Sequence, residues 1–244
     1  LIHADIKGLE VVTAAYLSRD PILFAEIWEQ YYRPELEDLH SLNQRLFKLP
    51  DRVTAKRFVF KLLYGGTAYG YSVDPNYAHI STSLKFWEKR INEFYDKYRR
   101  IHEWHEELVS TVVNEGCLQM PTGRQWLFPQ RDVIDRLWFW RPKILNYPVQ
   151  GTGADLVCIG RVAAWKRLRK AGLTQALWQS TVHDSLDLDV DNSLELVYNT
   201  IKVIDKAIRD IPINFERLFN VKFDLPVKAE ISYGPNLKDL QAYE

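Results

Sequence analysis

Cysteines and long apolar runs are both scarce in this chain of 244 residues. Its two cysteines, Cys117 and Cys158, have the spacing of neither a zinc site nor a disulfide framework, so we expect reduced thiols. No stretch approaches the ~20 apolar residues of a membrane-spanning helix, and nothing resembles a secretory signal peptide. These absences exclude disulfide-stabilised secreted domains and membrane-spanning proteins. They predict an intracellular protein without a membrane partner.

An excess of charge of either sign is also missing. Lys and Arg together number 32, as do Asp and Glu, so the formal net charge is zero. Nucleic-acid-binding domains are usually basic, and the net charge therefore gives no support for nucleic-acid binding. A local basic groove matters more than the sum, so this class of function is not excluded.

The chain also lacks internal repeats, low-complexity tracts and an initial methionine. Its first residues, Leu1-Ile2-His3, enter a strand pattern at once. We expect a fragment, a processed product or one part of a split protein. A chain of this length holds one large domain or two small ones.

Strand patterns stand at the start, middle and end of the chain, with helical patterns between them. The predicted strands and hairpins cover residues 1–4, 116–128, 177–190 and 225–233. The predicted helices cover residues 9–31 with a break near Pro21, and then 36–48, 51–64, 82–114, 150–170 and 193–210. This order predicts an α+β fold, in which an antiparallel sheet carries a helical insertion.

Two aspartates stand at the ends of predicted strands. Asp5 closes the first strand, and Asp184 lies at the tip of the 177–190 hairpin, whereas alternation directs Asp187 and Asp189 toward solvent. If the strands share a sheet, Asp5 and Asp184 can hold Mg²⁺, which takes one or two carboxylates plus substrate phosphates. Two such ions, roughly 3.5–4 Å apart, serve phosphoryl transfer. The alternative is an ordinary turn aspartate and a solvated strand end.

The predicted helix at 51–64 carries Arg52, Lys56, Phe60 and Tyr64 at intervals of four residues. At ~1.5 Å per residue these side chains form a stripe about 18 Å long. The two cations suit the phosphates of a nucleoside triphosphate, and the two rings suit its sugar and base. The alternative is an amphipathic helix with charges at one end and core aromatics at the other.

Four segments carry motifs that resemble, in the same order, those of one enzyme family. They are Ala4-Asp5-Ile6-Lys7-Gly8-Leu9-Glu10, the spaced series Arg52, Lys56, Phe60, Tyr64 and Gly65, the run Asn146-Tyr147-Pro148-Val149-Gln150-Gly151-Thr152-Gly153-Ala154-Asp155, and Val182-His183-Asp184. The chain resembles family A DNA polymerases, the group of bacterial polymerase I and of the replicases of small tailed phages. The resemblance runs nearly end to end, and the short segment between the first two motifs favours a phage-like member.

The resemblance implies a right-hand polymerase fold without its thumb. The palm is expected at residues 1–35 and 116–244, and the fingers at residues 36–115. The expected activity is template-directed transfer of deoxynucleotides from dNTPs to a primer 3′-hydroxyl, with two Mg²⁺ ions or Mn²⁺ as cofactor. The partners would be primer-template DNA and the thumb and exonuclease portion, either as an N-terminal segment or as a separate chain, so no proofreading is expected. The location would be a bacterial cytoplasm or a phage-infected host.

The resemblance also implies a role for individual residues. The metal ligands would be Asp5, Asp184 and the carbonyl of Ile6. The dNTP-binding residues would be Glu10 as a steric gate against ribose, His40, Arg52, Lys56 as the general acid for pyrophosphate, Phe60 and Tyr64. The DNA-binding residues would be Arg124, Arg141, Asn146, Gln150 and His183.

Three positions depart from the family pattern. Ser185 stands where the family has a Glu, so altered metal binding or rate is expected. Val12 stands where the family has an Arg, which would loosen the support beneath the site, and Gly153 replaces an Ala without an expected effect. One alternative is therefore a catalytically degenerate scaffold or DNA-binding subunit, although Asp5, Lys56 and Asp184 are all present. Another is a relative of single-subunit RNA polymerases, against which Glu10 argues.

Overall fold

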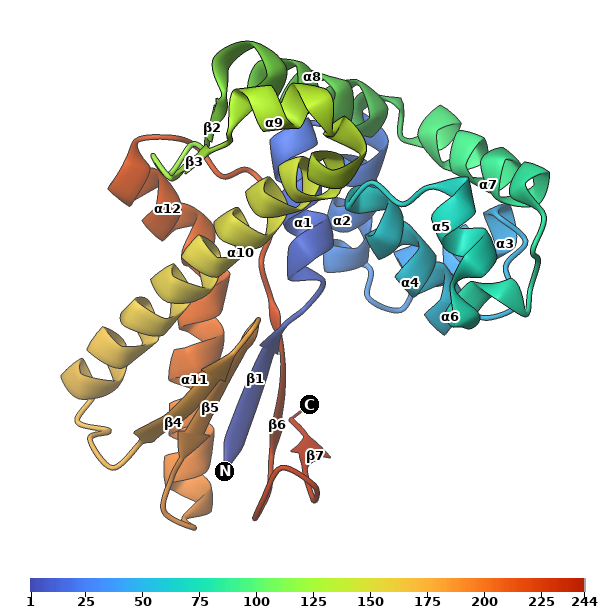
Figure 1. Cartoon of the computed structure of the whole chain (residues 1–244). Helices are drawn as coiled ribbons and strands as arrows, with labels where there is room; N and C mark the ends of the chain where they lie inside the picture. The colour runs from blue at the N-terminus through green and yellow to red at the C-terminus, as the bar shows by residue number, and fades with distance from the viewer. Residues whose placement is uncertain (244) are drawn as a thin grey trace. The chain divides into compact units, whose positions relative to one another are not determined.

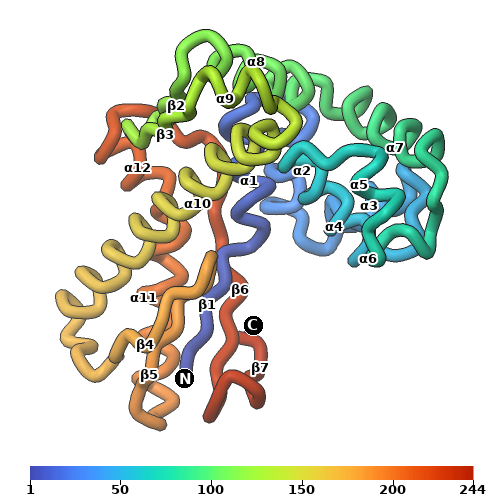
Figure 2. Tube along the Cα trace, viewed as in Figure 1, coloured from blue at the N-terminus to red at the C-terminus, as the bar shows by residue number. Residues whose placement is uncertain are grey.

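The computed structural model describes residues 1–243, which form two compact units. Unit 1 consists of Leu1–Leu9 together with the residues from Gly151 on, and unit 2 is Glu10–Gln150. The backbone leaves unit 1 after residue 9 and returns to it at residue 151 (Figure 2). A long segment is therefore inserted into unit 1, as the strand and helix order predicts.

Unit 1 is built on a five-stranded antiparallel sheet (Figure 1). The strands are β1 (Ile2–Ile6), β4 (Leu177–Val182), β5 (Ser185–Asp189), β6 (Ala229–Tyr233) and β7 (Gln241–Ala242). Their order across the sheet is β4-β5-β1-β6-β7, which makes the N-terminal strand the central one. The predicted antiparallel sheet with a helical insertion is confirmed.

The two faces of this sheet differ in character because side chains alternate along each strand. On β1 the side chains of Ile2, Ala4 and Ile6 are buried, whereas His3 and Asp5 point to the opposite face. Helix α11 (Leu194–Arg209) contacts β1 and β6, and it is followed by α12 (Ile211–Phe219). One face thus supplies the core of unit 1 and the other carries ionisable groups.

Unit 2 is mainly helical. Its elements are α1 (Leu9–Ser18), α2 (Pro21–Tyr32), α3 (Leu39–Leu46), α4 (Arg52–Leu63), α5 (Ala68–Val73), α6 (Pro75–Ala78), α7 (Leu84–Lys97), α8 (Arg99–Glu115), the hairpin β2 (Cys117–Gln119) and β3 (Gln125–Leu127), and α9 (Gln130–Asp135). Four of these helices begin at aspartates whose carboxylates accept hydrogen bonds from first-turn N–H groups, namely Asp20, Asp38, Asp51 and Asp74. Local sequence therefore fixes where these helices start.

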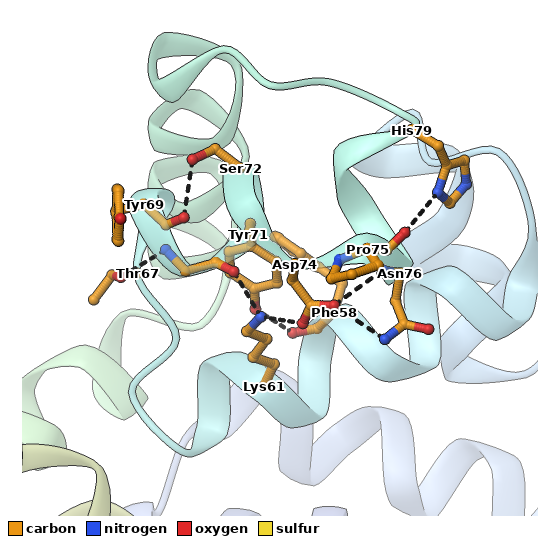
Figure 3. Close-up of polar contacts among 11 residues, drawn as sticks. Phe58, Lys61, Thr67, Tyr69, Tyr71, Ser72, Asp74, Pro75, Asn76 and His79 are labelled. Carbon is orange, nitrogen blue, oxygen red and sulfur yellow. Dashed lines mark hydrogen bonds and ion pairs between the residues drawn. The ribbon is translucent and has the colours of Figure 1, made fainter.

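Helix α4 is fixed by an aromatic core and by a polar bridge to α5 and α6. The buried rings of Tyr71 and Trp87 stack with centroids 5.0 Å apart. The Lys61 amine donates to the Gly70 carbonyl at 2.9 Å and pairs with the Asp74 carboxylate at 2.6 Å (Figure 3). The Tyr71 hydroxyl donates to the Phe58 carbonyl at 2.8 Å. These contacts hold one side of α4 and leave the opposite side exposed.

The helix expected at 150–170 is longer than the prediction, which placed its start after Pro148. Helix α10 runs from Leu137 to Lys170 and passes through Pro142 and Pro148. A proline removes one N–H from the helical ladder and crowds the preceding turn, so local rules predict a break. The buried side chains of Ile144, Leu145 and Val149 hold the helix together on both sides of Pro148.

Other elements were predicted with wrong bounds or not at all. The stretch 82–114 forms two helices, divided at Tyr98, whose buried hydroxyl donates to Glu26 at 2.7 Å. The last predicted strand begins at Ala229 instead of 225. Helices α5, α6 and α9 and strand β7 were missed because they are short, and α12, which follows α11 directly, was missed as well. No helix within residues 1–243 combines the length and the apolar character needed to cross a membrane.

The prediction that Asp187 faces solvent is wrong, since its side chain lies in a strand with neighbours on both sides and the residue is 4% exposed. One carboxylate oxygen contacts His3 Nδ1 at 2.6 Å, and the other accepts from the Ser180 hydroxyl at 2.5 Å. Alternation identifies a face of the sheet but not its degree of burial, which depends on the strands that pair with β5. Asp189 is exposed, as expected.

Candidate active site

The candidate residues fall in both units, with Asp5, Ile6, His183 and Asp184 in unit 1 and the others in unit 2. In unit 1, β1 pairs antiparallel with β5, so that Asp5 lies opposite Ser185. The Ile6 N–H donates to the Asp184 carbonyl at 3.0 Å, and His183 occupies a left-handed turn conformation with φ of 52°. Strand pairing and this turn bring the side chain of Asp184 beside that of Asp5.

The electrostatics of unit 1 show that the two carboxylates interact. Burial is the largest cause that raises the pKa of Asp5, to about 6. The negative charge of Asp184 and a hydrogen bond between the two carboxyl groups raise it further, Glu230 adds to the effect, and His3 opposes it. Two carboxylates so close together repel each other, and a cation bound between them would relieve that repulsion.

The donor set fits a magnesium ion. Within residues 1–243, no three or more His, Cys, Asp or Glu side chains come together as a metal-binding group. Mg²⁺ does not require such a group, because it keeps several waters and is usually held by one or two carboxylates plus substrate phosphates. Asp5, Asp184 and a backbone carbonyl such as that of Ile6 therefore suit Mg²⁺ better than a transition metal.

In unit 2, the start of α3 positions Arg52. The Asp38 carboxylate accepts from the N–H groups of His40 and Ser41, each at 2.9 Å, and so begins the helix. It also accepts from Arg52 Nε at 2.6 Å. Asp38 therefore holds the guanidinium of α4 at the N-terminal end of α3.

Three basic side chains gather around this end of α3. Burial lowers the pKa of His40 to about 4, and the positive charges of Lys56 and Arg52 lower it further, against the effect of Asp38. The buried Nδ1 of His40 has no hydrogen-bond partner within residues 1–243. The Phe60 ring lies 5.8 Å from the His40 ring and 5.7 Å from the Lys56 amine. Clustered cations and an unpaired ring nitrogen favour an anionic ligand.

A second cluster in unit 2 joins α1, α4 and α10. The Tyr64 hydroxyl donates to Glu10 Oε1 at 2.7 Å, and the Gln150 amide donates to the same oxygen at 2.6 Å. The amide of Gln150 also lies 2.6 Å from the Tyr64 hydroxyl. Burial, and then the charge of Glu10, raise the pKa of Tyr64, so the phenol stays protonated. The Glu10 carboxylate is thus held in one orientation by two donors.

The comparison with known proteins decides the family. The sequence pattern that defines DNA polymerase family A matches residues 1–239. The chain belongs to DNA polymerase family A. The motif resemblance and the architecture lead to the same family.

Two relatives illustrate the extent of the match. The DNA polymerase of Bacillus phage SP01 is 26% identical over 192 residues, which cover 77% of this chain and 20% of the phage protein. The thermostable DNA polymerase I of Thermus filiformis is 27% identical over 235 residues, which cover 88% of this chain and 26% of that protein. The chain therefore spans about a fifth to a quarter of the length of these two relatives.

A solved structure gives the same fold. The polymerase domain of Pol1 from M. smegmatis, in complex with DNA primer-template and dNTP, aligns with a TM-score of 0.77 at 20% sequence identity. The alignment covers 96% of this chain and 39% of that one. The match supports the α+β fold predicted from the order of strands and helices, and the polymerase-domain architecture that the family resemblance implies.

Most residues that the family motifs single out lie beside at least one other. The structure brings together Asp5 with Asp184, His40 with Arg52, Lys56 and Phe60, and Glu10 with Tyr64 and Gln150. The metal-binding, dNTP-binding and catalytic roles of these residues stay predictions.

The predicted DNA-binding residues are more scattered. Arg141 pairs with Glu106 at 2.6 Å, and Arg124 lies 6.0 Å from the Trp126 ring. Asn146 is half-buried on α10, and His183 is exposed in the turn that carries Asp184. The DNA-binding roles of these four residues also stay predictions.

Sequence reasoning missed several supporting residues. Asp38 is one of them, since it both starts α3 and holds Arg52. His3 lies two positions before Asp5, and strand alternation could have placed it on the same face of the sheet. Nothing local predicts its bond to Asp187, because the two residues are 184 positions apart in the sequence.

Proposed function

We propose that this chain is the catalytic core of a template-directed DNA polymerase, which transfers nucleotides from dNTPs to a primer 3′-hydroxyl. The observation that carries the proposal is the carboxylate pair of Asp5 and Asp184 in a member of DNA polymerase family A, where burial and then the charge of Asp184 raise the pKa of Asp5 to about 6. Such a pair suits a reaction in which charge on phosphoryl oxygens must be neutralised.

The residues proposed to hold Mg²⁺ are Asp5, Asp184 and the carbonyl of Ile6. Two such ions, or Mn²⁺ in their place, would supply charge neutralisation for the attacking and leaving oxygens. The part of the protein itself is to keep the two carboxylates on adjacent strands, so that the site needs little rearrangement. Ser185 adds no carboxylate, since its hydroxyl donates to the Val182 carbonyl at 3.0 Å inside the turn.

The basic cluster of unit 2 is proposed to bind the triphosphate. Arg52, held by Asp38, offers a forked guanidinium, while Lys56 offers a mobile point charge. Lys56 would also donate a proton to the departing pyrophosphate, a general-acid role. Phe60 would contact the sugar, and the Nδ1 atom of His40 would supply one more contact to a phosphate oxygen.

Glu10 is proposed to exclude ribonucleotides. Its carboxylate is fixed by Tyr64 and Gln150, so it cannot swing aside to admit a 2′-hydroxyl. A half-buried carboxylate whose oxygen already accepts from two donors leaves a substrate hydroxyl badly placed, and a mismatch of this kind discriminates strongly. Deoxynucleotides would therefore be preferred, which separates this chain from a relative of RNA polymerases.

Primer and template are the proposed macromolecular partners. The residues proposed to contact them are Arg124, Arg141, Asn146, Gln150 and His183. The palm is proposed to comprise residues 1–35 and 116–244, and the fingers residues 36–115.

Primer extension tests the proposal. A primed DNA template, Mg²⁺ and dNTPs would be incubated with the wild type, Asp184→Ala and, as a matched control, Asp189→Ala, which alters an exposed carboxylate of the same hairpin. We expect extension by the wild type and by Asp189→Ala, with a loss of more than about 100-fold in Asp184→Ala, since even outer-shell metal partners contribute 10–100-fold.

Two other results would decide against a catalytic role. A folded wild-type chain that never extends the primer, even with the remainder of the polymerase added, would contradict the proposal. If dNTP binding then survived Asp184→Ala unchanged, the chain would act as a scaffold subunit.

A further inference from the structure

Two large aromatic side chains lie exposed on the first turns of α10. Trp138 is 78% exposed and Phe139 is 43% exposed, and their ring centroids are 6.0 Å apart at 74°. Large rings usually contribute to folding by being buried, and these two contribute little in that way. Exposed aromatic side chains that lie next to one another commonly mark a binding surface.

The charge around these rings is positive. The Lys143 amine lies 4.1 Å from the Phe139 ring centroid and 4.4 Å from that of Trp140. Residues 136–150 contain Arg136, Arg141 and Lys143 but no acidic residue. Two of these cations have an acidic partner: Arg136, at the end of α9, approaches Asp132 of the same helix at 3.7 Å, and Arg141 pairs with Glu106 of α8. Within residues 1–243 the Lys143 amine has these ring contacts and no acidic partner, which leaves its charge available to an anion.

The exposed rings continue a stripe that begins at the candidate site of unit 2. Phe139, Lys143, Asn146 and Gln150 follow one another at intervals of three or four residues, so they share one face of α10. At ~1.5 Å per residue this stripe is about 16 Å long. Its far end is Gln150, whose amide donates to Glu10.

We propose that Trp138 and Phe139 form a stacking platform for an unpaired nucleotide of the template strand, with Lys143 beside its phosphate. The inference rests on the proposed polymerase function and adds a subsite to it. In a duplex the faces of each internal base are covered by its neighbours, and the end of a blunt duplex offers only a closed base pair, so the rings are expected to stack on the unpaired bases of a single strand. Stacking of this kind accepts every base, because each has a π-face.

The charge pattern favours nucleic acid over a protein partner. A stripe that alternates rings, a lysine amine and amide groups, with no acidic residue among them, complements a chain of phosphates and bases. Single strands are bound by this combination of stacking rings and cations. Lys143 joins the stacking rings and the cation in one place, because its amine lies against the rings and carries the only charge among the four residues of that stripe.

Binding of two labelled DNAs to the whole chain tests the platform. One is a primed template with a single-stranded 5′ extension, and the other is the blunt duplex of the same paired sequence, both measured by fluorescence anisotropy at low salt. We expect Trp138→Ala to weaken binding of the extended template roughly 5- to 100-fold, the range given by loss of one base–aromatic stack. Binding of the blunt duplex should change less than about twofold, a difference typical of a surface substitution.

Two further variants serve as controls. Trp138→Phe keeps a ring and should restore most of the affinity for the extended template. Tyr32→Ala removes a side chain that is 72% exposed elsewhere in unit 2, and it should change neither affinity. Circular dichroism confirms that each variant is folded.

Lys143→Met tests the phosphate contact independently. Loss of one phosphate contact should reduce the slope of log affinity against log salt by about 0.7 for a single strand. An unchanged slope, with an unchanged affinity in Trp138→Ala, would overturn the proposal and assign the rings to a protein contact. Equal losses on extended and blunt DNA would also overturn it, since the rings would then contact paired DNA.

The platform can fail while the polymerase proposal stands. If the wild type extends primers and Trp138→Ala behaves like it on both DNAs, only the platform is wrong. If the wild type binds extended and blunt DNA equally, the platform is wrong whatever the catalytic result. Primer extension by the wild type tests the catalytic proposal separately.

Discussion

The hydroxyl of Tyr64 donates a hydrogen bond of 2.7 Å to the carboxylate of Glu10, and so joins two residues that are 54 positions apart. Gln150 donates to the same carboxylate oxygen. A carboxylate fixed by two donors is a rigid obstacle, whereas a free glutamate would move aside. The relationship gives Glu10 a defined position from which to exclude a ribose hydroxyl.

Substitution of Glu10 should relax the choice of sugar. In Glu10→Ala, the preference for deoxynucleotides over ribonucleotides should fall by roughly 100-fold, because the obstacle is removed. Tyr64→Phe removes one of the two donors and should lower the preference by about tenfold, in line with a hydrogen bond to a charged group. Single-nucleotide incorporation of matched dNTPs and NTPs measures both effects. An unchanged preference in Glu10→Ala would remove the gate from the account.

Neutralisation of Asp5 should stabilise the metal-free protein. The pKa of Asp5 is raised from 3.8 to about 6, so the folded state binds its proton more tightly than the unfolded state. The stability from this group is present below the unfolded value and is lost as pH rises through about 6. Asp5→Asn should therefore unfold at higher urea concentration than the wild type at neutral pH in EDTA.

The expected gain in Asp5→Asn is about 1 kcal/mol, which allows for solvent screening of a partly exposed group. The two proteins should converge as the pH falls below the unfolded pKa of the carboxyl. Added Mg²⁺ should stabilise the wild type and not the variant. A wild type that is the more stable protein at neutral pH without metal would contradict the charge repulsion described here.

Nucleotide binding should tighten as pH falls, because of His40. Burial and the charges of Lys56 and Arg52 keep its pKa near 4, so it is neutral in the free protein. A bound triphosphate brings negative charge next to the imidazole and raises that pKa, so binding takes up a proton. The Kd for a dNTP should therefore decrease as the pH is lowered. Calorimetry from neutral pH down to the onset of acid unfolding measures it.

His40→Asn provides the control for this effect, because it keeps a polar side chain without a titrating group. Its Kd should change less with pH than that of the wild type. The same slope in both proteins would mean that His40 does not face the phosphates.

Gly65 should be intolerant of a side chain. It has φ of 79°, a conformation that L residues rarely adopt, and an added Cβ would lie 2.9 Å from Cδ1 of Leu145. Gly65→Ala should lower the free energy of unfolding by roughly 1–3 kcal/mol, from backbone strain and crowding together. Gly123→Ala is the matched control, because φ is 81° there and nothing lies within 4 Å of the added atom. Urea unfolding should show the larger loss for Gly65→Ala.

The sequence predicts those parts of the molecule that depend on local rules. Asp20, Asp38 and Asp51 start helices through bonds to the next few N–H groups, and the predicted helix positions follow from such caps. The spacing of Arg52, Lys56 and Phe60 on one helix is likewise local. These three residues are near one another in the structure because four-residue intervals fix their positions on α4.

The features that the sequence did not predict depend on contacts between residues far apart in the chain. Whether Asp187 is exposed or buried depends on strands that pair on both sides of β5, one of which is the first strand of the chain. The passage of α10 through Pro148 depends on packing of Leu145 and Val149, which outweighs the local break. The pairing of Arg52 with Asp38 is set by the way α3 and α4 pack.

The central claim is that Asp5 and Asp184 hold the same metal ions. A double-mutant cycle of Asp5→Asn and Asp184→Asn tests it most directly, with the rate of single-nucleotide incorporation measured for each variant. If the two carboxylates hold the same ions, each single variant should lose more than about 100-fold. The double variant should then be no slower than the worse single variant, because residues that act as a unit are not additive. Near wild-type incorporation by either single variant, or losses that multiply in the double variant, would contradict a shared metal site.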